Sequence, residues 1–217
     1  MKFGMLKALL CAWTVGLVGC STVQHAQAVE EPVKTRVLLL THPSLDAGVV
    51  SNAQDWAERN TYVLWEHEVA SFEEGLSIQA LADQLASKQD AKWFGVIGVG
   101  PLAKNVKLHE HVDTNRMVAV VNTTVLGHED TQVFTRRLER MFIRGYAKLL
   151  GIGASPNPRC CLFPYKTVVN LDQIGRNCCP PFAIQMRELG PAKGLEPRPR
   201  RLPPGYLIRK PTTEKKK

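Results

Sequence analysis

Two pairs of adjacent cysteines are the residues of this 217-residue chain best suited to chemistry: Cys160-Cys161 and Cys178-Cys179. Thiolates can ligate zinc, but structural zinc sites mostly use cysteines spaced as C-x-x-C, and adjacent cysteines suit that geometry less well. In an oxidising compartment, two disulfides between the first pair and the second are the simpler product. We therefore expect disulfides, with both pairings open, and keep a four-cysteine zinc site as the alternative.

A cluster of histidine and carboxylate residues lies earlier in the chain. The segment from His109 to Asp113 imitates the start of the H-x-H-x-D-H motif of metallo-β-lactamase folds, but Thr114 replaces the final histidine. His109 and His111 are alternate residues of an extended segment and so face the same side, which allows a two-histidine metal site with help from His128. The simpler interpretation is an exposed polar loop.

The first twenty residues have the features of an export signal. Lys2 and Lys7 precede the apolar run from Leu9 to Val18, which is too short to span a bilayer comfortably. Leu17-Val18-Gly19-Cys20 forms a lipobox, in which the Cys20 thiol receives a diacylglycerol. We predict a signal peptide over residues 1–19 and a lipidated N-terminus with a linker over residues 20–32.

A lipidated Cys20 would anchor the protein in the cell envelope, because two or more acyl chains bind membranes stably. Ser21 after the cysteine favours the outer membrane if the host is Gram-negative. The alternative is cleavage by the ordinary signal peptidase after Ala26-Gln27-Ala28. Membrane lipid is thus the first expected partner, and both alternatives imply export.

The net charge of +8 is concentrated at the C-terminus. Residues 187–217 hold ten Lys and Arg against three Glu, whereas residues 21–186 hold 16 basic against 17 acidic residues. We predict a proline-rich, basic, disordered tail over 187–217 and a nearly neutral domain over 33–186. This distribution argues against a nucleic-acid partner and favours contact with an anionic polymer or acidic peptide, unless the tail is only a solvated terminus.

Apolar runs that alternate with amphipathic segments indicate an α/β fold with a mixed sheet of about four strands and flanking helices. The pattern predicts strands over 33–40, 62–69, 93–99 and 117–125, helices over 47–59 and 77–87, and a polar connector over 101–115. A long helix is predicted from Asp130 to about Leu150, followed by a cysteine-rich irregular segment.

The long helix has two faces. Its apolar stripe is formed by Phe134, Leu138, Met141, Phe142, Leu149 and Leu150. Its other side carries Arg137, Arg140, Arg144 and Lys148, which form either an anion-binding groove or a solvated face.

The strand Val118–Thr123, the helix through Arg136 and Arg140, and the sequence Leu149-Leu150-Gly151-Ile152-Gly153 together resemble the archaemetzincins. The resemblance covers roughly residues 90–180 and implies a metzincin-like fold. In that family the helix carries H-E-x-x-H, a glycine allows the turn that follows, and a third histidine completes a zinc site in which the glutamate is the general base.

With Gly151 taken as the turn glycine, the resemblance places the first two zinc ligands at Arg144 and Lys148, the catalytic glutamate at Gly145 and the third ligand at Ala154. The side chains at these positions are two cations, a hydrogen atom and a methyl group, and none of them offers zinc a lone pair at neutral pH. Proteolysis by the family mechanism is therefore not expected.

The resemblance also places Ser155 where the family has its first cysteine, Cys160 at the second, and Leu162 at the methionine of the Met-turn. We therefore expect a non-catalytic, archaemetzincin-like domain on a lipoprotein, with a role in binding or in envelope structure and no required cofactor. The alternative is a zinc-dependent metallopeptidase with an atypical or relocated metal site.

Overall fold

The computed structural model describes residues 35–73 and 75–199. The predicted signal peptide, Cys20 and the linker over 20–32 lie outside these residues, as does the end of the predicted tail from residue 200 onward. Within the described part, no helix is both long and apolar enough to cross a membrane.

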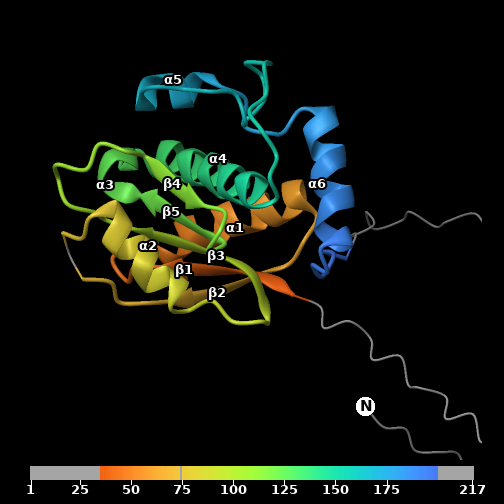
Figure 1. Ribbon diagram of the computed structural model, residues 1–217. Helices are drawn as coiled ribbons and strands as arrows, with labels where there is room; N and C mark the ends of the chain where they lie inside the picture. The colour runs from red at the N-terminus through yellow and green to blue at the C-terminus, as the bar shows by residue number, and fades with distance from the viewer. Residues whose placement is uncertain (1–34, 74, 200–217) are drawn as a thin grey trace, which may run out of the picture. The chain divides into compact units, whose positions relative to one another are not determined.

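A five-stranded mixed sheet forms the centre of the fold (Figure 1). Its order is β2-β1-β3-β5-β4, and all neighbours are parallel except β4 and β5. The strands are β1 (Arg36–Thr41), β2 (Trp65–Val69), β3 (Trp93–Gly100), β4 (Glu110–Asp113) and β5 (Val118–Asn122). The central β3 and β5 are apolar on both faces, as expected of parallel strands covered on both sides.

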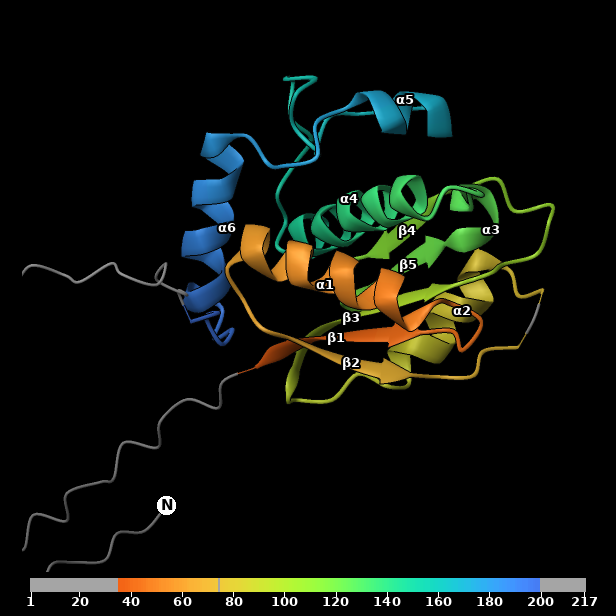
Figure 2. The same ribbon diagram turned by 180° about the vertical axis from the view of Figure 1, so that it is seen from behind.

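Helices cover the two faces unequally. Helices α1 (Ala47–Thr61) and α4 (Thr131–Leu149) lie against one face, and α2 (Ile78–Ala86) lies against the other (Figure 2). Each begins where the sequence supplies an N-cap: the side chains of Asp46, Ser77 and Asp130 accept hydrogen bonds from backbone N–H groups of the first turn. These caps are why the predicted starts of the three helices agree with the structure.

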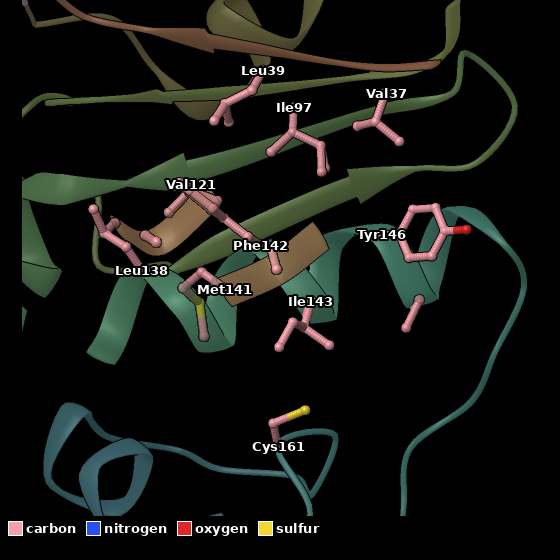
Figure 3. Packing of buried hydrophobic residues seen from close by; sticks show 14 of the residues in the cluster. Val37, Leu39, Ile97, Val121, Leu138, Met141, Phe142, Ile143, Tyr146 and Cys161 are labelled. Atoms are coloured by element: carbon pink, nitrogen blue, oxygen red, sulfur yellow. The ribbon is translucent and has the colours of Figure 1, made fainter. Parts of the chain in front are cut away.

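The larger hydrophobic core lies between the sheet and the α1–α4 layer. Val37, Leu39 and Ile97 of the sheet pack against α4 through Phe142 and its buried neighbours (Figure 3). Cys161 belongs to the same cluster but lies on the side of α4 away from the sheet. Helix α4 is therefore covered on two sides, by the sheet and by the cysteine-rich segment.

Two predicted elements are wrong. The connector over 101–115 contains β4, which sequence patterning missed because this edge strand has no buried side and all four of its residues are half-buried. The strand predicted over 117–125 ends at Asn122, whose side chain accepts the N–H of Thr124 and starts α3 (Thr123–Leu126).

The C-terminal segment is more regular than predicted. It contains α5 (Val168–Gln173) and α6 (Pro180–Ala192), so the predicted boundary at residue 186 falls inside a helix. Beyond α6, Leu195 pairs with Thr35 and Pro197 pairs with Val63. Residues 187–199 are thus part of the domain, and not of a disordered tail.

Candidate functional site

The three arginines of the predicted basic stripe are buried, which fits neither of the two alternatives, an anion-binding groove or a solvated helix face. Arg137, Arg140 and Arg144 are each less than 8 % exposed, and only Lys148 keeps substantial exposure, at 42 % of its side chain. A buried guanidinium is tolerated only where its donors are satisfied. The site is therefore defined by what these arginines contact.

Arg144 joins three parts of the fold. Its Nε and Nη2 lie 3.1 Å from Oε1 of Glu110 on β4, and its Nη1 donates to the backbone oxygens of Cys161 and Phe163, both at 2.9 Å. Its guanidinium also lies 4.8 Å from the ring centre of Tyr165. All the contacts of Arg144 thus connect α4 to the edge strand and to the turn that carries the first cysteine pair.

Glu110 is the shared anion of this cluster. Lys148 donates to the same oxygen, Oε1, at 2.7 Å, whereas the buried Oε2 has no partner among the described residues. The Glu110 side chain is 11 % exposed. Two cations therefore converge on one buried carboxylate, and together these residues form what we call the Glu110 cluster: Glu110, Arg144 and Lys148.

The other two arginines fix the segment that follows α4. Arg137 makes a two-pronged ion pair with Asp172 of α5, with distances of 2.9 and 2.6 Å. Arg140 donates to the backbone oxygens of Ile174 and Gly175, and its burial lowers the pKa of its guanidinium. Arg137 and Arg140, which lie one turn apart on α4, thus bind neighbouring parts of the chain segment from Asp172 to Gly175.

The structure brings together the positions that the family resemblance assigned to zinc ligands. Arg144, Lys148 and Ala154, the assigned ligand positions, line one small cavity of about 120 Å³ together with Leu162, the assigned Met-turn position. Gly151, the assigned turn glycine, has a φ of +82°, a left-handed conformation that favours glycine at the end of a helix.

Gly145, the position assigned to the catalytic glutamate, is buried against the sheet. A Cβ added there would lie 3.4 Å from Ala119 Cβ and 3.6 Å from Ile97 Cδ1. The position has room for a methyl group, and the atoms nearest to that methyl group are apolar. The general base of the family mechanism therefore has no counterpart at this residue.

The four cysteines form a second site beside the Glu110 cluster. The sulfurs of Cys160, Cys161 and Cys178 all lie within 4.8 Å of one another, and the Cys161–Cys178 separation is 3.2 Å. Cys179 lies 3.5 Å from Ser155 Oγ and donates its backbone N–H to Cys160 Sγ. All four are free thiols in the structure, so the predicted disulfides stay a prediction.

Hydrogen bonding distinguishes the thiols within this cluster. The thiol of Cys161 and the backbone N–H groups of Cys179 and Leu162 donate to Cys160, which lowers the pKa of Cys160 to about 4. Hydrogen bonds to Cys160 and Cys178 and burial raise the pKa of Cys161. The hydrogen bonds therefore favour the thiolate at Cys160 over that at Cys161, and the thiolate is the form that binds metal or attacks a disulfide.

The three histidines proposed as a metal site do not meet. His109 packs against the ring of Tyr165, His111 lies on β4, and His128 accepts the backbone N–H of Asp130. Burial lowers the pKa of His109. The cysteine group is the only cluster of three metal-ligating side chains in the described part of the chain.

Comparisons with known proteins identify the fold. No family model matches the sequence, and no curated protein matches it. Among solved structures, archaemetzincin from Methanopyrus kandleri superposes with a TM-score of 0.61 at 14 % identity over 74 % of this chain and 98 % of its own. The domain has an archaemetzincin-like fold.

Two further solved structures agree with this assignment. A zinc-dependent peptidase from Methanocorpusculum labreanum gives a TM-score of 0.57 at 13 % identity, and archaemetzincin from Archaeoglobus fulgidus, complexed with malonate, gives 0.51 at 14 %. Each alignment covers 69 % of this chain and 99 % of the other. At such identities the likeness establishes the fold, and the chemistry must be argued from the residues of this archaemetzincin-like chain.

The residues fit zinc at one of the two candidate positions. Around the small cavity, a guanidinium and an ammonium carry protons and provide no lone pair, so the donor set does not fit zinc. Three of the thiols, those of Cys160, Cys161 and Cys178, provide suitable ligands, because sulfurs bound tetrahedrally at about 2.3 Å from zinc lie roughly 3.8 Å apart. Sulfur separations within 4.8 Å are close to that spacing.

Sequence reasoning missed the two carboxylates that matter most, Glu110 and Asp172. Each lies more than 30 residues from its arginine partner in the chain. One signal was present in the sequence. The long helix carries three arginines on one face and must also pack against a cysteine-rich segment, so buried arginines there would require acidic partners. Nothing in the local pattern indicated which acidic residues supply them.

Proposed function

We propose that this protein is a non-catalytic, archaemetzincin-like lipoprotein of the cell envelope, anchored through acylated Cys20, that acts in binding or in envelope structure. Its remaining contacts are with an anionic polymer or acidic peptide, for which the basic residues beyond 199 provide charge, and not with nucleic acid. One observation carries the loss of catalysis: Arg144 is buried, with all of its described hydrogen-bond partners inside the protein.

This arrangement explains how the fold dispenses with a catalytic metal. A zinc ion held by a helix would attract negatively charged or lone-pair donors from the neighbouring elements. The Arg144 guanidinium does so instead, since it attracts the Glu110 carboxylate and two carbonyl oxygens from the next turn. The Arg144 guanidinium thus provides a positive charge that cross-links these elements, but it provides no lone pair that could bind a catalytic zinc ion.

The test combines metal content, thiol content and activity. The chain from Ser21 onward, purified once with a reductant and once without, is analysed by elemental mass spectrometry, by free-thiol titration and with an unfolded protein substrate. The proposal expects no peptide hydrolysis in either sample. Hydrolysis that a chelator abolishes would overturn it.

A zinc peptidase with a relocated metal site is the second candidate, and the thiol cluster favours it. One zinc per chain with protected thiols, together with no hydrolysis, would indicate a structural metal and leave the proposal intact. Hydrolysis that is lost in Cys161→Ser but retained in Lys148→Met would move the active site to the cysteines. Near-zero zinc with no free thiols would instead support the two disulfides.

A further inference from the structure

A polar groove between α1 and α4 has no part in the Glu110 cluster or the thiol cluster. Its volume is about 440 Å³, and it shares no lining residue with the small cavity at Arg144. The lining comes from α1, from the first half of α4 and from the loop before α6, as follows: Asn52, Trp56, Arg59, Thr131, Gln132, Thr135, Arg136, Glu139 and Arg176. We call this surface the α1–α4 groove.

Three arginines and one carboxylate line the groove. The carboxylate, Glu139, is 1 % exposed and is occupied by a two-pronged ion pair with Arg176. The side chain of Arg136, by contrast, is exposed and makes no hydrogen bond or ion pair within the described part of the chain. The guanidinium of Arg136 is therefore free to bind a ligand in the groove.

Trp56 holds the other two guanidiniums in place. Arg176 lies 3.4 Å from the centre of the indole ring and Arg59 lies 5.3 Å from it, both within the range of cation–π contacts. Arg59 is also paired with Asp55 at 2.6 Å. Positions fixed in advance reduce the entropy lost when a ligand is bound, so the groove is partly organised before binding.

The first turn of α4 adds polar side chains to the groove. Thr131 and Gln132 line it there, where the Asp130 carboxylate already accepts the backbone N–H groups of the turn. The side-chain amides of Asn52 and Gln132 provide neutral N–H donors. Guanidiniums and side-chain amides are groups that bind tetrahedral oxyanions.

We propose that the α1–α4 groove binds a phosphate monoester. Guanidiniums pair with phosphate oxygens in two-pronged geometry, and the unpaired guanidinium of Arg136 is open to such a pair. The groove is several times larger than a phosphate group, so it also accommodates a small alcohol portion. Because Trp56 is covered by two arginines, it is not available to stack a nucleobase.

The test uses the full chain in detergent, with glycerol 3-phosphate as the probe and calorimetry and tryptophan fluorescence as readouts. We expect saturable binding that weakens as salt increases. Arg136→Gln should weaken it at least tenfold and Arg136→Glu should abolish it, while the thermal midpoint stays unchanged because this side chain has no internal partner. Trp56→Phe should remove the fluorescence response.

Arg159→Gln is the matched control, since Arg159 is an exposed arginine outside the groove, and it should leave binding unchanged. A second arm compares glycerol 3-phosphate with soluble dihexanoyl phosphatidic acid. Equal affinities identify a free phosphate monoester, and much tighter binding of the lipid identifies a lipid headgroup. Absence of binding to both probes, or equal loss in Arg136→Gln and Arg159→Gln, would overturn the proposal.

Discussion

Replacing Arg144 with methionine tests whether the guanidinium is the cross-link that holds the cysteine-rich segment on α4. Methionine replaces the apolar stem of the arginine side chain but removes the guanidinium and with it every donor. The change leaves Glu110 buried with Lys148 as its remaining partner, and it leaves the carbonyl oxygens of Cys161 and Phe163 without the donor they now share. The Arg144 side chain is 8 % exposed, so water does not readily replace the lost contacts.

The expected loss of stability is large. Breaking a buried ion pair by removing one partner costs about 3–5 kcal/mol, and each buried carbonyl left without a donor costs roughly 1–3 kcal/mol. These terms overlap, because Lys148 and local relaxation recover part of them. We expect Arg144→Met to lower the free energy of unfolding by about 3–5 kcal/mol, which corresponds to a fall in melting temperature of roughly 6–20 °C.

Urea denaturation followed by circular dichroism measures this loss, with Lys148→Met as the matched control. Lys148 donates to the same oxygen of Glu110, but its side chain is 42 % exposed, so its removal should cost about 1 kcal/mol or less. If the two variants lose equal stability, or if Arg144→Met loses less than about 1 kcal/mol, the cross-link argument is refuted.

Four further predictions follow from the described contacts. Gly145→Ala should stabilise the protein by about 0.5–1 kcal/mol through helix propensity, whereas Gly145→Glu should unfold or strongly destabilise it by burying a carboxylate against the sheet; thermal melts separate the two outcomes. Because burial lowers the pKa of His109, the unfolded chain binds more protons, so stability should fall as the pH drops below about 6.5. His109→Phe should reduce that fall. The prediction is contradicted if the melting temperature changes equally between pH 7.5 and pH 5.5 in the original protein and in His109→Phe. If Cys161 and Cys178 pair under oxidising conditions, mutating either to alanine should cost on the order of 3 kcal/mol and mutating both should cost no more, whereas additive losses would indicate the other pairing. Asp172→Ala should release α5 from its arginine and speed limited proteolysis there, and an unchanged cleavage rate would show that the ion pair does not hold the segment.

The sequence predicted the elements whose burial produces a regular pattern. Helix α4 was placed to within a residue at each end, because Asp130 caps it and its apolar positions recur at helical spacing. Strand β4 was not predicted, since an edge strand with one neighbour needs no apolar alternation. The hydrophobic pattern therefore predicted elements that pack against the core, where burial determines residue type. It did not predict the edge strand, where burial does not determine residue type.

The residues that the resemblance assigned to zinc-ligand positions, Arg144, Lys148 and Ala154, line one cavity in the structure. Whether the family's zinc site stood there stays a prediction. The sequence could not reveal that the arginines are buried, because that depends on carboxylates and carbonyl oxygens distant in the chain. Charged residues on an amphipathic helix are normally exposed, and here Glu110 and Asp172 reverse that rule.

The pairing of the two ends of the described chain has a mechanical consequence. The N–H of Thr35 donates to the carbonyl oxygen of Gly194 at 2.9 Å, the N–H of Glu196 donates to that of Thr35 at 2.8 Å, and Arg36 forms an ion pair with Glu196. A pulling force applied through residues before Thr35 would load these bonds first. The contacts between Thr35 and the stretch from Gly194 to Glu196 must therefore break before tension reaches β1 and the centre of the sheet.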